Sequence, residues 1–224
     1  MLIFVSEGIF LEDKIYVFLF DVSNLKESDL SFISKELPRV IKEKIEAKKL
    51  LKSKLLTAVS YKMLFDFCKE KLGFIPKVKI KSGGKPYFEN GGIHFSISHS
   101  KNIAVCAISQ SEVGIDIERL DKERDYLSLA ERYFTKKEYE KIRESENIKE
   151  AFIKYWTAKE AYIKYTGEGF KRGMNYFEAD FGSFPHFKGE NMPSLYTEKF
   201  GNEFYLSLVY SGNKNIEIIK RVVL

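Results

Sequence analysis

The sequence predicts an α+β protein whose sheets are mainly antiparallel. Segments with the residue pattern of strands cluster together instead of alternating singly with helices, and helices followed by strands occur twice along the chain. Of the 224 residues, 44% are hydrophobic and 31% are charged, as in folded globular proteins. This length suits two small domains of about 100 residues each. We therefore predict two halves, residues 1–110 and 111–224, with the boundary near Ser109 to Ser111.

The first half is expected to begin with a pair of strands and continue into helix. Residues 1–10 and 14–22 are rich in β-branched and aromatic side chains. A Lys-, Glu- and Leu-rich stretch follows, which is predicted to be mostly helical up to Lys71 with Ser28 or Ser31 as its cap. Near-helical spacing predicts one buried face, made of Leu50, Leu51, Leu55, Val59, Met63 and Phe67.

The middle of the chain is predicted to contain turns and strands. Gly73 is expected to end the long helix, and Gly83-Gly84-Lys85-Pro86 and Asn90-Gly91-Gly92 have the composition of turns. Residues 94–98 alternate polar and apolar side chains, as a half-buried strand does. A continuous apolar run covers residues 103–108.

The second half is predicted to repeat the plan of helices followed by strands. Alternation returns at residues 113–118, and helices are expected at 127–143 and 149–165. Strands are expected near residues 176–181, 203–210 and 216–223.

Charge and cysteine content narrow the class of protein. The net charge of +5 and pI near 8.9 suit anionic partners, although net charge alone favours the simpler interpretation of a solvated basic surface. Cys68 and Cys106 lack metal or redox spacing, so we expect buried free thiols in a reducing compartment. The sequence contains no apolar run of the roughly eighteen residues that a membrane span needs, and the N-terminus has no basic leader. We therefore expect a cytoplasmic protein that does not enter a membrane.

Two carboxylates at residues 116 and 118 form the first candidate site. In a strand over residues 113–118, Asp116 and Glu118 share one face, roughly 7 Å apart, while Val113, Ile115 and Ile117 take the buried face. Oxygen ligands in this arrangement suit Mg²⁺, which usually binds one or two carboxylates plus substrate phosphates. The alternative is an acidic face turned to solvent.

A helical motif supplies the second candidate. Trp156, Glu160 and Lys164 follow one another at i, i+4 and i+8, so they line one side of the predicted helix. Glu160 then serves as a third oxygen ligand or a base, and Lys164 as a phosphate clamp. The alternative is an ordinary Glu–Lys pair on the helix surface.

Three shorter motifs are weaker. His99 follows the predicted strand and lies between two serines. It is either a hydrogen-bonded loop residue or a hydrogen-bond donor to a phosphate group of a ligand. The turn before Pro86 lacks the P-loop pattern. Thr135 and Glu138 have the spacing of a capping box, which predicts the start of a helix.

Taken in order, these motifs resemble those of the surfactin-type 4′-phosphopantetheinyl transferases. The run is G-K-P, F-S-I-S-H-S, G-I-D-I-E, F-T-x-x-E and W-T-x-K-E-A-x-x-K, ending at Gly167-Glu168-Gly169. The shorter holo-acyl-carrier-protein synthases, which work as trimers, carry related motifs, but this chain is too long for them. The resemblance implies two similar α/β halves about a pseudo-twofold, with an active-site cleft between them, and we expect a monomer.

The resemblance also implies an activity and its catalytic residues. The enzyme would transfer the 4′-phosphopantetheine group of coenzyme A to a serine of an apo acyl or peptidyl carrier protein, releasing 3′,5′-ADP. By position in the motifs, Asp116, Glu118 and Glu160 would hold Mg²⁺ against the pyrophosphate, and Lys164 would neutralise it. Glu160 or Glu138 would assist deprotonation of the carrier serine.

Other residues are implied to bind coenzyme A. Lys85 and Pro86 would line the adenine end, and Ser98 and His99 would contact the phosphates. The sequence departs from the family in residues 48–54, where lysines stand in place of the usual arginines. A lysine is a point charge and not a planar fork, so the resemblance assigns no single residue there.

Two other functions are compatible with the residues. One is a different Mg²⁺-dependent phosphoryl or nucleotidyl transferase that uses the same carboxylates. The other is a basic nucleic-acid-binding module in which aromatic rings stack on bases. Because the aromatic residues mostly occupy core-period positions, we expect no nucleic-acid partner.

Overall fold

A computed structural model describes residues 14–81, 84–89, 92–120, 123–212 and 214–220. The expected strand at residues 1–10 lies outside this part of the chain. The elements in chain order are β1 (Lys14–Asp21), α1 (Glu27–Lys35), α2 (Arg39–Glu46), α3 (Leu51–Leu72), β2 (Val78–Ile80), β3 (Pro86–Phe88), β4 (His94–Ser100), β5 (Ile103–Ser109), β6 (Val113–Arg119), α4 (Tyr126–Tyr133), α5 (Lys136–Arg143), α6 (Ile148–Thr166), a 3₁₀ turn η1 (Gly169–Arg172), β7 (Ala179–Asp180), β8 (His186–Phe187), β9 (Ser194–Phe200), β10 (Phe204–Tyr210) and β11 (Asn215–Lys220).

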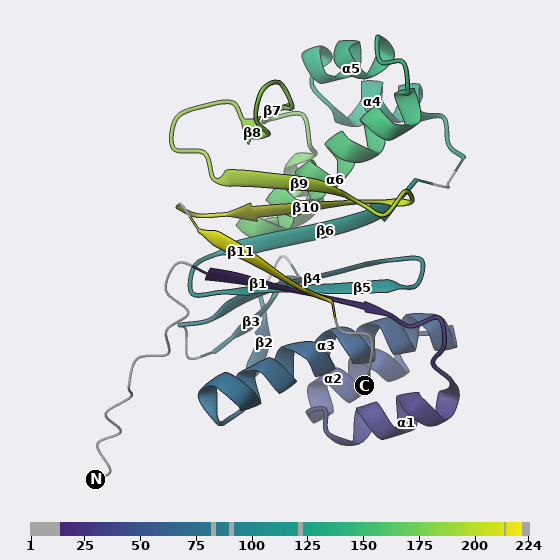
Figure 1. Cartoon of the computed structure of the whole chain (residues 1–224), viewed down its shortest axis with the longest axis vertical. Helices are drawn as coiled ribbons and strands as arrows, with labels where there is room; N and C mark the ends of the chain where they lie inside the picture. Colours follow the sequence, from purple (N-terminus) through teal and green to yellow (C-terminus); the bar gives the residue numbers. More distant parts are fainter. Residues whose placement is uncertain (1–13, 82–83, 90–91, 121–122, 213, 221–224) are drawn as a thin grey trace.

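The strands form two main sheets and a small hairpin (Figure 1). The first sheet has the order β11-β1-β5-β4 and the second has the order β6-β10-β9-β8-β7. All pairings are antiparallel except that of β1 with β11, so the predicted α+β class with mainly antiparallel sheets is confirmed. Because β11 follows the second sheet in sequence but pairs with β1 in the first, the end of the described chain ties the two sheets together.

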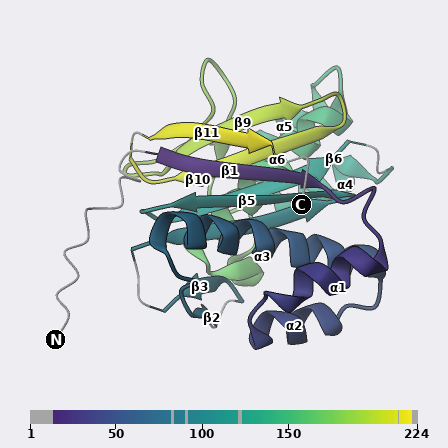
Figure 2. The same ribbon diagram turned by 60° about the horizontal axis from the view of Figure 1, so that its bottom comes forward.

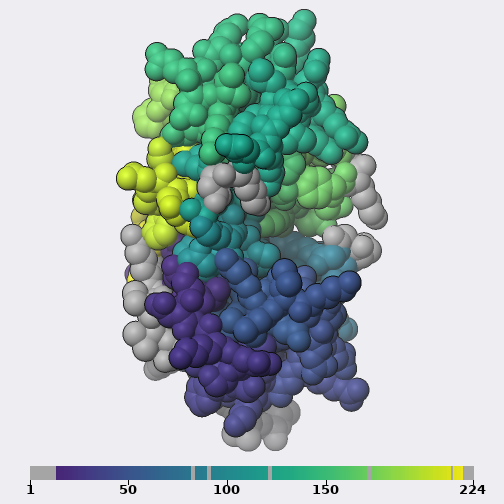
Figure 3. Space-filling model, turned by 90° about the vertical axis from the view of Figure 1, so that its right-hand side faces the viewer, coloured from purple at the N-terminus to yellow at the C-terminus, as the bar shows by residue number. Residues whose placement is uncertain are grey.

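The sheets lie between two layers of helices. Helices α1, α2 and α3 cover one face of the first sheet, as Figure 2 shows, and their apolar side chains share one core with β4 and β5. Helices α4, α5 and α6 form a second core with the other sheet. In the space-filling view the N-terminal and C-terminal helices occupy opposite ends of the molecule (Figure 3). None of the helices in the described ranges is long and apolar enough to cross a bilayer.

A third apolar cluster fills the space between the sheets. It combines inward-facing side chains of β1 and β5 with those of β6 and β10. The alternation predicted for residues 113–118 is therefore confirmed on its apolar side, where Val113, Ile115 and Ile117 are each fully buried. This packing sets β6 directly against the first sheet.

The first helical region differs from its prediction. The stretch expected to run as helix to Lys71 is three helices, and Pro38 is the residue that precedes the first turn of α2. Neither Ser28 nor Ser31 caps α1, because the capping position is Lys26. Leu50 and Leu51 are exposed, since they lie at the very start of α3, before its buried face begins; Leu55, Val59, Met63 and Phe67 are buried as predicted. Gly73 ends α3 in the left-handed conformation, as expected.

The second half also differs in detail. The helix expected over residues 127–143 is divided into α4 and α5, and the predicted capping box of Thr135 and Glu138 begins α5. Only residues 179–180 of the strand expected at 176–181 are extended. Strand β9 was not predicted, because its exposed face carries polar side chains within a short, mixed sequence. Helix α6 and strand β10 lie close to their predicted ranges.

Gly114 lets α6 pack directly on β6. A Cβ atom at this position would lie 2.1 Å from the carbonyl oxygen of Ala161 and 2.4 Å from the backbone nitrogen of Tyr165. Both atoms belong to the backbone of α6, so no side-chain rotation relieves the clash. The helix that carries Glu160 and Lys164 is therefore held as near to β6 as backbone atoms allow.

We predict that Gly114→Ala lowers the free energy of unfolding by about 3 kcal/mol, because the helix must move away from the strand. Gly182→Ala is the matched control, since its added Cβ would meet nothing nearer than 3.6 Å. Urea denaturation of both variants measures the difference. Equal stability of the two variants would contradict the close approach of α6 to β6.

Candidate active site

A cavity of about 500 Å³ lies where β4, β6, α3 and α6 meet. This volume is in the range of small-molecule sites. It is lined by eight of the nine candidate residues, which come from four separate segments of the chain: Lys85, Pro86, Ser98, His99, Asp116, Glu118, Glu160 and Lys164.

The two sheets meet along a row of serines on β4. Ser96, Ser98 and Ser100 are all buried and point from β4 toward β6. The Ser96 hydroxyl accepts a hydrogen bond from the backbone N–H of Ile115 at 3.1 Å, and the Ser100 hydroxyl accepts one from the N–H of Arg119 at 3.1 Å. The polar face that alternation predicted for β4 is therefore not a solvent face. We call these three residues the serine seam, since they join the two sheets beside the cavity.

Asp116 is buried in this seam. It is 4% exposed, so the alternative of a solvent-facing acidic pair is wrong for this residue. Its Oδ1 atom accepts hydrogen bonds from the Ser98 hydroxyl and the Lys164 ammonium, both at 2.7 Å. Its Oδ2 atom has no hydrogen-bond partner in the described part of the chain, although it is fully buried. A buried carboxylate oxygen without a partner is energetically costly, so this atom is suited to bind a cation or a water molecule.

Glu160 and Glu118 bring two further carboxyl groups to the cavity. Burial raises the pKa of Glu160 to about 8, and the nearby charges of Asp116 and Glu118 add to this rise, while Lys164 opposes it. The Glu118 carboxylate accepts a hydrogen bond from the Ser100 hydroxyl at 3.2 Å. All three carboxyl groups therefore line the same cavity.

These carboxylates can take part in binding a cation but do not complete a site alone. Within the described residues, no three His, Cys, Asp or Glu side chains are grouped closely enough to hold a metal by themselves. Mg²⁺ needs only one or two carboxylates when waters and substrate phosphates supply the other oxygens. The free Oδ2 atom of Asp116 is the donor that fits such a partial site.

Basic side chains also line the cavity. Lys164 donates a second hydrogen bond, to the Ser98 hydroxyl, at 2.8 Å. Desolvation, together with the charges of Lys164 and Lys48, lowers the pKa of His99 below its usual value, although the residue remains exposed to solvent. Lys44 donates to the hydroxyl of Tyr61 at 3.2 Å, and burial followed by the charge of Lys48 lowers its pKa. This side of the cavity is suited to anions.

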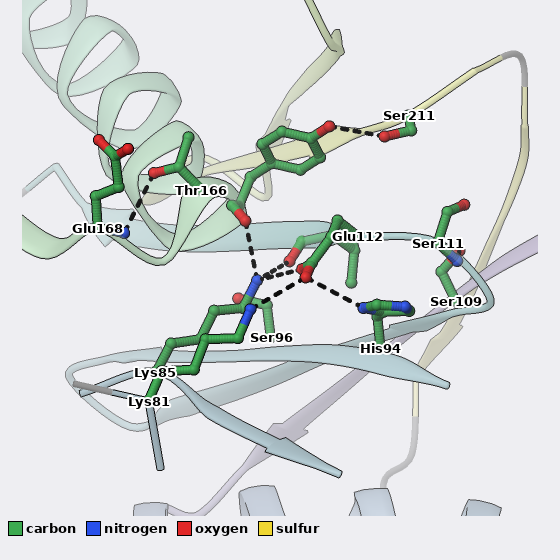
Figure 4. Close-up of polar contacts among 12 residues, drawn as sticks. Lys81, Lys85, His94, Ser96, Ser109, Ser111, Glu112, Thr166, Glu168 and Ser211 are labelled. Carbon is green, nitrogen blue, oxygen red and sulfur yellow. Dashed lines mark hydrogen bonds and ion pairs between the residues drawn. The ribbon is translucent and has the colours of Figure 1, made fainter. Parts of the chain in front are cut away.

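Lys85 lies at the rim but its ammonium is directed away from the cavity's carboxylates. It donates to the Glu112 carboxylate at 2.7 Å and to the backbone carbonyls of Val113 and Tyr165 (Figure 4). Burial lowers the pKa of Lys85, and the hydrogen bond and charge of Glu112 oppose that effect. Pro86 follows it as the first residue of β3 and lines the same wall.

Glu138 is the candidate that the structure does not bring to the cavity. It lies on the buried side of α5 and is completely buried. Its Oε2 atom is 2.8 Å from the Lys159 ammonium, and its Oε1 atom accepts a hydrogen bond from the N–H of Ala179. Lys159, also completely buried, donates to the carbonyls of Met174 and Phe177, both at 2.6 Å. The expectation that Glu138 acts as a base therefore has no geometric support, because both of its oxygens bind the protein.

Several lining residues were missed by the sequence analysis. They are Lys44 from α2, Thr57, Ser60 and Tyr61 from α3, and Phe170 from η1. Thr57 and Ser60 are polar residues at buried positions of the otherwise apolar face of α3, and this interruption of the apolar pattern is the sequence signal that could have identified them. Of the lysines in residues 48–54, Lys48 is the one among the lining residues.

Comparisons with known proteins find similarity to one superfamily over part of the chain. A family model for the 4′-phosphopantetheinyl transferase superfamily matches residues 112–217. The 4′-phosphopantetheinyl transferase HetI of Nostoc sp. is 43% identical over 100 residues, which cover 42% of this chain and 42% of that protein. The 4′-phosphopantetheinyl transferase gsp of Aneurinibacillus migulanus is 43% identical over 99 residues, covering 43% of this chain and 40% of that protein.

A solved structure is more distant. The holo-[acyl-carrier-protein] synthase of Thermotoga maritima superposes with a TM-score of 0.39 at 19% identity, over 45% of this chain and 62% of that one, which is too low to establish a common fold. The alignments with the two transferases span less than half of each relative. The matched residues 112–217 include Asp116, Glu118, Glu160 and Lys164, and the resemblance seen in the motifs is confirmed for this part of the chain.

The raised pKa of Glu160 predicts how the stability of the metal-free protein depends on pH. Because the pKa is about 8 in the folded protein and 4.5 for an ordinary Glu, the folded state holds an extra proton between these values. This stabilisation is complete below pH 4.5 and is lost as the pH rises toward 8. From this group alone, we expect the free energy of unfolding measured by urea in EDTA to be about 2 kcal/mol lower near pH 8.5 than near pH 6.5.

Glu160→Gln should remove that contribution, and the comparison of variant with wild type isolates it from other titrating groups. Glu178→Gln is the matched control, because Glu178 pairs with Lys188 outside the cavity lining. Parallel pH curves for the wild type and Glu160→Gln would show that the carboxyl group titrates normally and would contradict the described electrostatics.

Proposed function

We propose that the protein is a 4′-phosphopantetheinyl transferase, which moves the phosphopantetheine group of coenzyme A to a serine of an apo acyl or peptidyl carrier protein. The observation that carries the proposal is the buried Asp116, whose Oδ2 atom lacks a partner inside a cavity that also holds Glu160 and Lys164. The names of the relatives HetI and gsp support the same reaction.

The carboxylates support a divalent cation as the cofactor. Asp116, Glu118 and Glu160 are the residues that would hold Mg²⁺, with Oδ2 of Asp116 as the preorganised donor. When bound, the cation supplies charge neutralisation of the pyrophosphate. Its binding requires a deprotonated Glu160, so the raised pKa of that group couples metal affinity to pH.

The basic residues have roles in the transfer itself. The carrier serine oxygen forms a bond to the pantetheine-side phosphorus, and the bond from that phosphorus to the oxygen of the departing 3′,5′-ADP breaks. Lys164 can turn from Asp116 toward a phosphate oxygen and stabilise the charge that accumulates on the leaving group. His99 and Lys48 add positive or donor groups on the same side of the cavity.

The serine hydroxyl must also lose its proton. Glu160 and Glu138 were the two candidates for the base. Glu160 remains, because the oxygens of Glu138 bind Lys159 and the N–H of Ala179. A deprotonated Glu160 facing the cavity can accept the proton directly or through water. Activity is then expected to rise with pH as this group ionises.

The setting of the reaction follows from other residues. Cys68 and Cys106 are both free and buried, which supports a reducing compartment and hence the cytoplasm. The aromatic rings of Phe18, Phe67 and Phe152 pack against other rings in the cores, so a base-stacking role in nucleic-acid binding is not favoured. We propose a monomer, as the two sheets of one chain already enclose the cavity.

One incubation tests the proposed reaction. The protein is mixed with coenzyme A, Mg²⁺ and an apo carrier protein, and the carrier is read by intact mass. The expected result is a carrier heavier by one phosphopantetheine group, with 3′,5′-ADP formed in equal amount, and loss of the product in EDTA. A carrier of unchanged mass against several acyl and peptidyl carriers would reject the proposal.

We predict that Asp116→Asn reduces transfer by about 100-fold or more, because a neutral amide binds a divalent cation and the Lys164 ammonium more weakly than the carboxylate does. The change keeps the side-chain size, so the fold should remain, as circular dichroism and urea unfolding will test. Asp180→Asn is the matched control, since Asp180 pairs with Lys141 and Lys188 on β7. A folded Asp116→Asn variant with the activity of the control would contradict the role of Asp116.

A further inference from the structure

The ammonium of Lys85 connects three elements of the fold. Its hydrogen bonds go to the Glu112 carboxylate at 2.7 Å, the Tyr165 carbonyl at 3.0 Å and the Val113 carbonyl at 3.3 Å. A lysine ammonium has three hydrogens to donate. All three are therefore accounted for by protein acceptors, and the group has no donor left for a ligand phosphate while this arrangement holds.

Two of those acceptors lie on the elements that carry the proposed catalytic groups. Val113 is the first residue of β6, which bears Asp116 three residues later, and Tyr165 follows Lys164 near the end of α6. The lysine itself belongs to the β2–β3 hairpin of the other half of the chain. Figure 4 shows the side chain reaching from the hairpin to both elements.

Glu112 is the centre of this arrangement. Besides Lys85, its carboxylate accepts a hydrogen bond from Lys81 at 3.3 Å, and the ring nitrogen Nδ1 of His94 lies 3.4 Å from it. Burial alone would raise the pKa of Glu112, but the hydrogen bond and charge of Lys85, with His94 and Lys81, lower it overall. The carboxylate thus remains ionised and holds two lysines of the same hairpin.

The hairpin depends on contacts outside itself, which include the burial of Val78 and Phe88 in the first core. Strands β2 and β3 have three residues each and form a two-stranded sheet of their own. An isolated pair of this size is marginally stable at best. The aliphatic part of Lys85 packs close to Gly167, where an added Cβ would lie 3.1 Å from its Cδ atom. Glycine is also favoured there by the positive φ of 72°.

We propose that Glu112 is a positioning residue, which holds Lys85 and the β2–β3 hairpin against β6 and α6 and so preforms the cavity wall made by Lys85 and Pro86. The inference rests on the proposed function, because coenzyme A is the ligand whose nucleotide end this wall would meet. The aliphatic part and the backbone of Lys85 then form part of the cavity wall, while its ammonium group binds Glu112 and the two carbonyls instead of a ligand.

Glu112→Gln tests the proposal, and Glu89→Gln is its matched control. Glu89 pairs with Lys77 and Lys79 on the same hairpin, and its side chain is 32% exposed compared with 34% for Glu112, but these partners do not reach β6 or α6. Both changes remove one negative charge and keep the size of the side chain. They differ in whether the contact to the second half is lost.

Hydrogen exchange and ligand affinity are measured on both variants. We expect the amides of residues 78–81, 84, 85, 87 and 88 to exchange about tenfold faster in Glu112→Gln than in the wild type, since a charged hydrogen bond typically contributes this much. The dissociation constant of 3′,5′-ADP by calorimetry should rise by a similar factor. In the transfer assay, KM for coenzyme A should rise more than kcat falls. The control should match the wild type in all three measurements.

Three results would overturn the proposal. They are unchanged exchange in Glu112→Gln, unchanged affinity despite faster exchange, and an equal effect of Glu89→Gln. The exchange measurement needs no ligand, so it separates this inference from the proposed function. A wild-type protein that binds neither coenzyme A nor 3′,5′-ADP would reject the function and the cavity-shaping role together, while the exchange data would still report whether Glu112 holds the hairpin.

Discussion

The contact between β4 and β6 is the constraint on which the rest of the structure depends. Two sheets with their own helical layers meet there, and three alternate serines satisfy polar groups of β6 that would otherwise be buried without partners. The same side of β6 carries Asp116 and Glu118, while its apolar side completes the core between the sheets. Placing the carboxylates beside the cavity is therefore a consequence of how the sheets are joined.

Three lysines from two of the motifs show how one residue type has different roles in the structure. Lys159 is fully buried and paired with Glu138, so it supports the second core. Lys85 connects the hairpin to β6 and α6 through Glu112 and two carbonyls. Lys164 is the partly exposed one, and its contacts with Asp116 and Ser98 lie inside the cavity, where a ligand can replace them. Burial and the number of fixed acceptors, more than the motif, separate these roles.

The sequence predicted the parts of the site that follow from local periodicity. Alternation along residues 113–118 placed Asp116 and Glu118 on one face, and helical spacing placed Glu160 and Lys164 on one side of α6. It did not predict that the face of Asp116 is buried, because that depends on β4 from elsewhere in the chain. The contributions of Lys44 and Tyr61 depend likewise on how α2 and α3 pack. Glu138 was a wrong site candidate because a helix-capping residue and a catalytic base are both carboxylates in the sequence. Only the partners of its oxygens in the folded protein show which role it has.

The proposed cation would bind the Oδ2 atom of Asp116, since that buried oxygen lacks a partner among the described residues. The most direct measurement is the anomalous signal of Mn²⁺ in crystals grown with 3′,5′-ADP. One strong peak is expected about 2.1 Å from Asp116 Oδ2 and near a phosphate oxygen of the nucleotide. This is the distance of a hard divalent cation from its oxygen ligands. A nucleotide bound in the cavity with no peak beside Asp116, or a peak elsewhere on the protein, would contradict the proposed cation site.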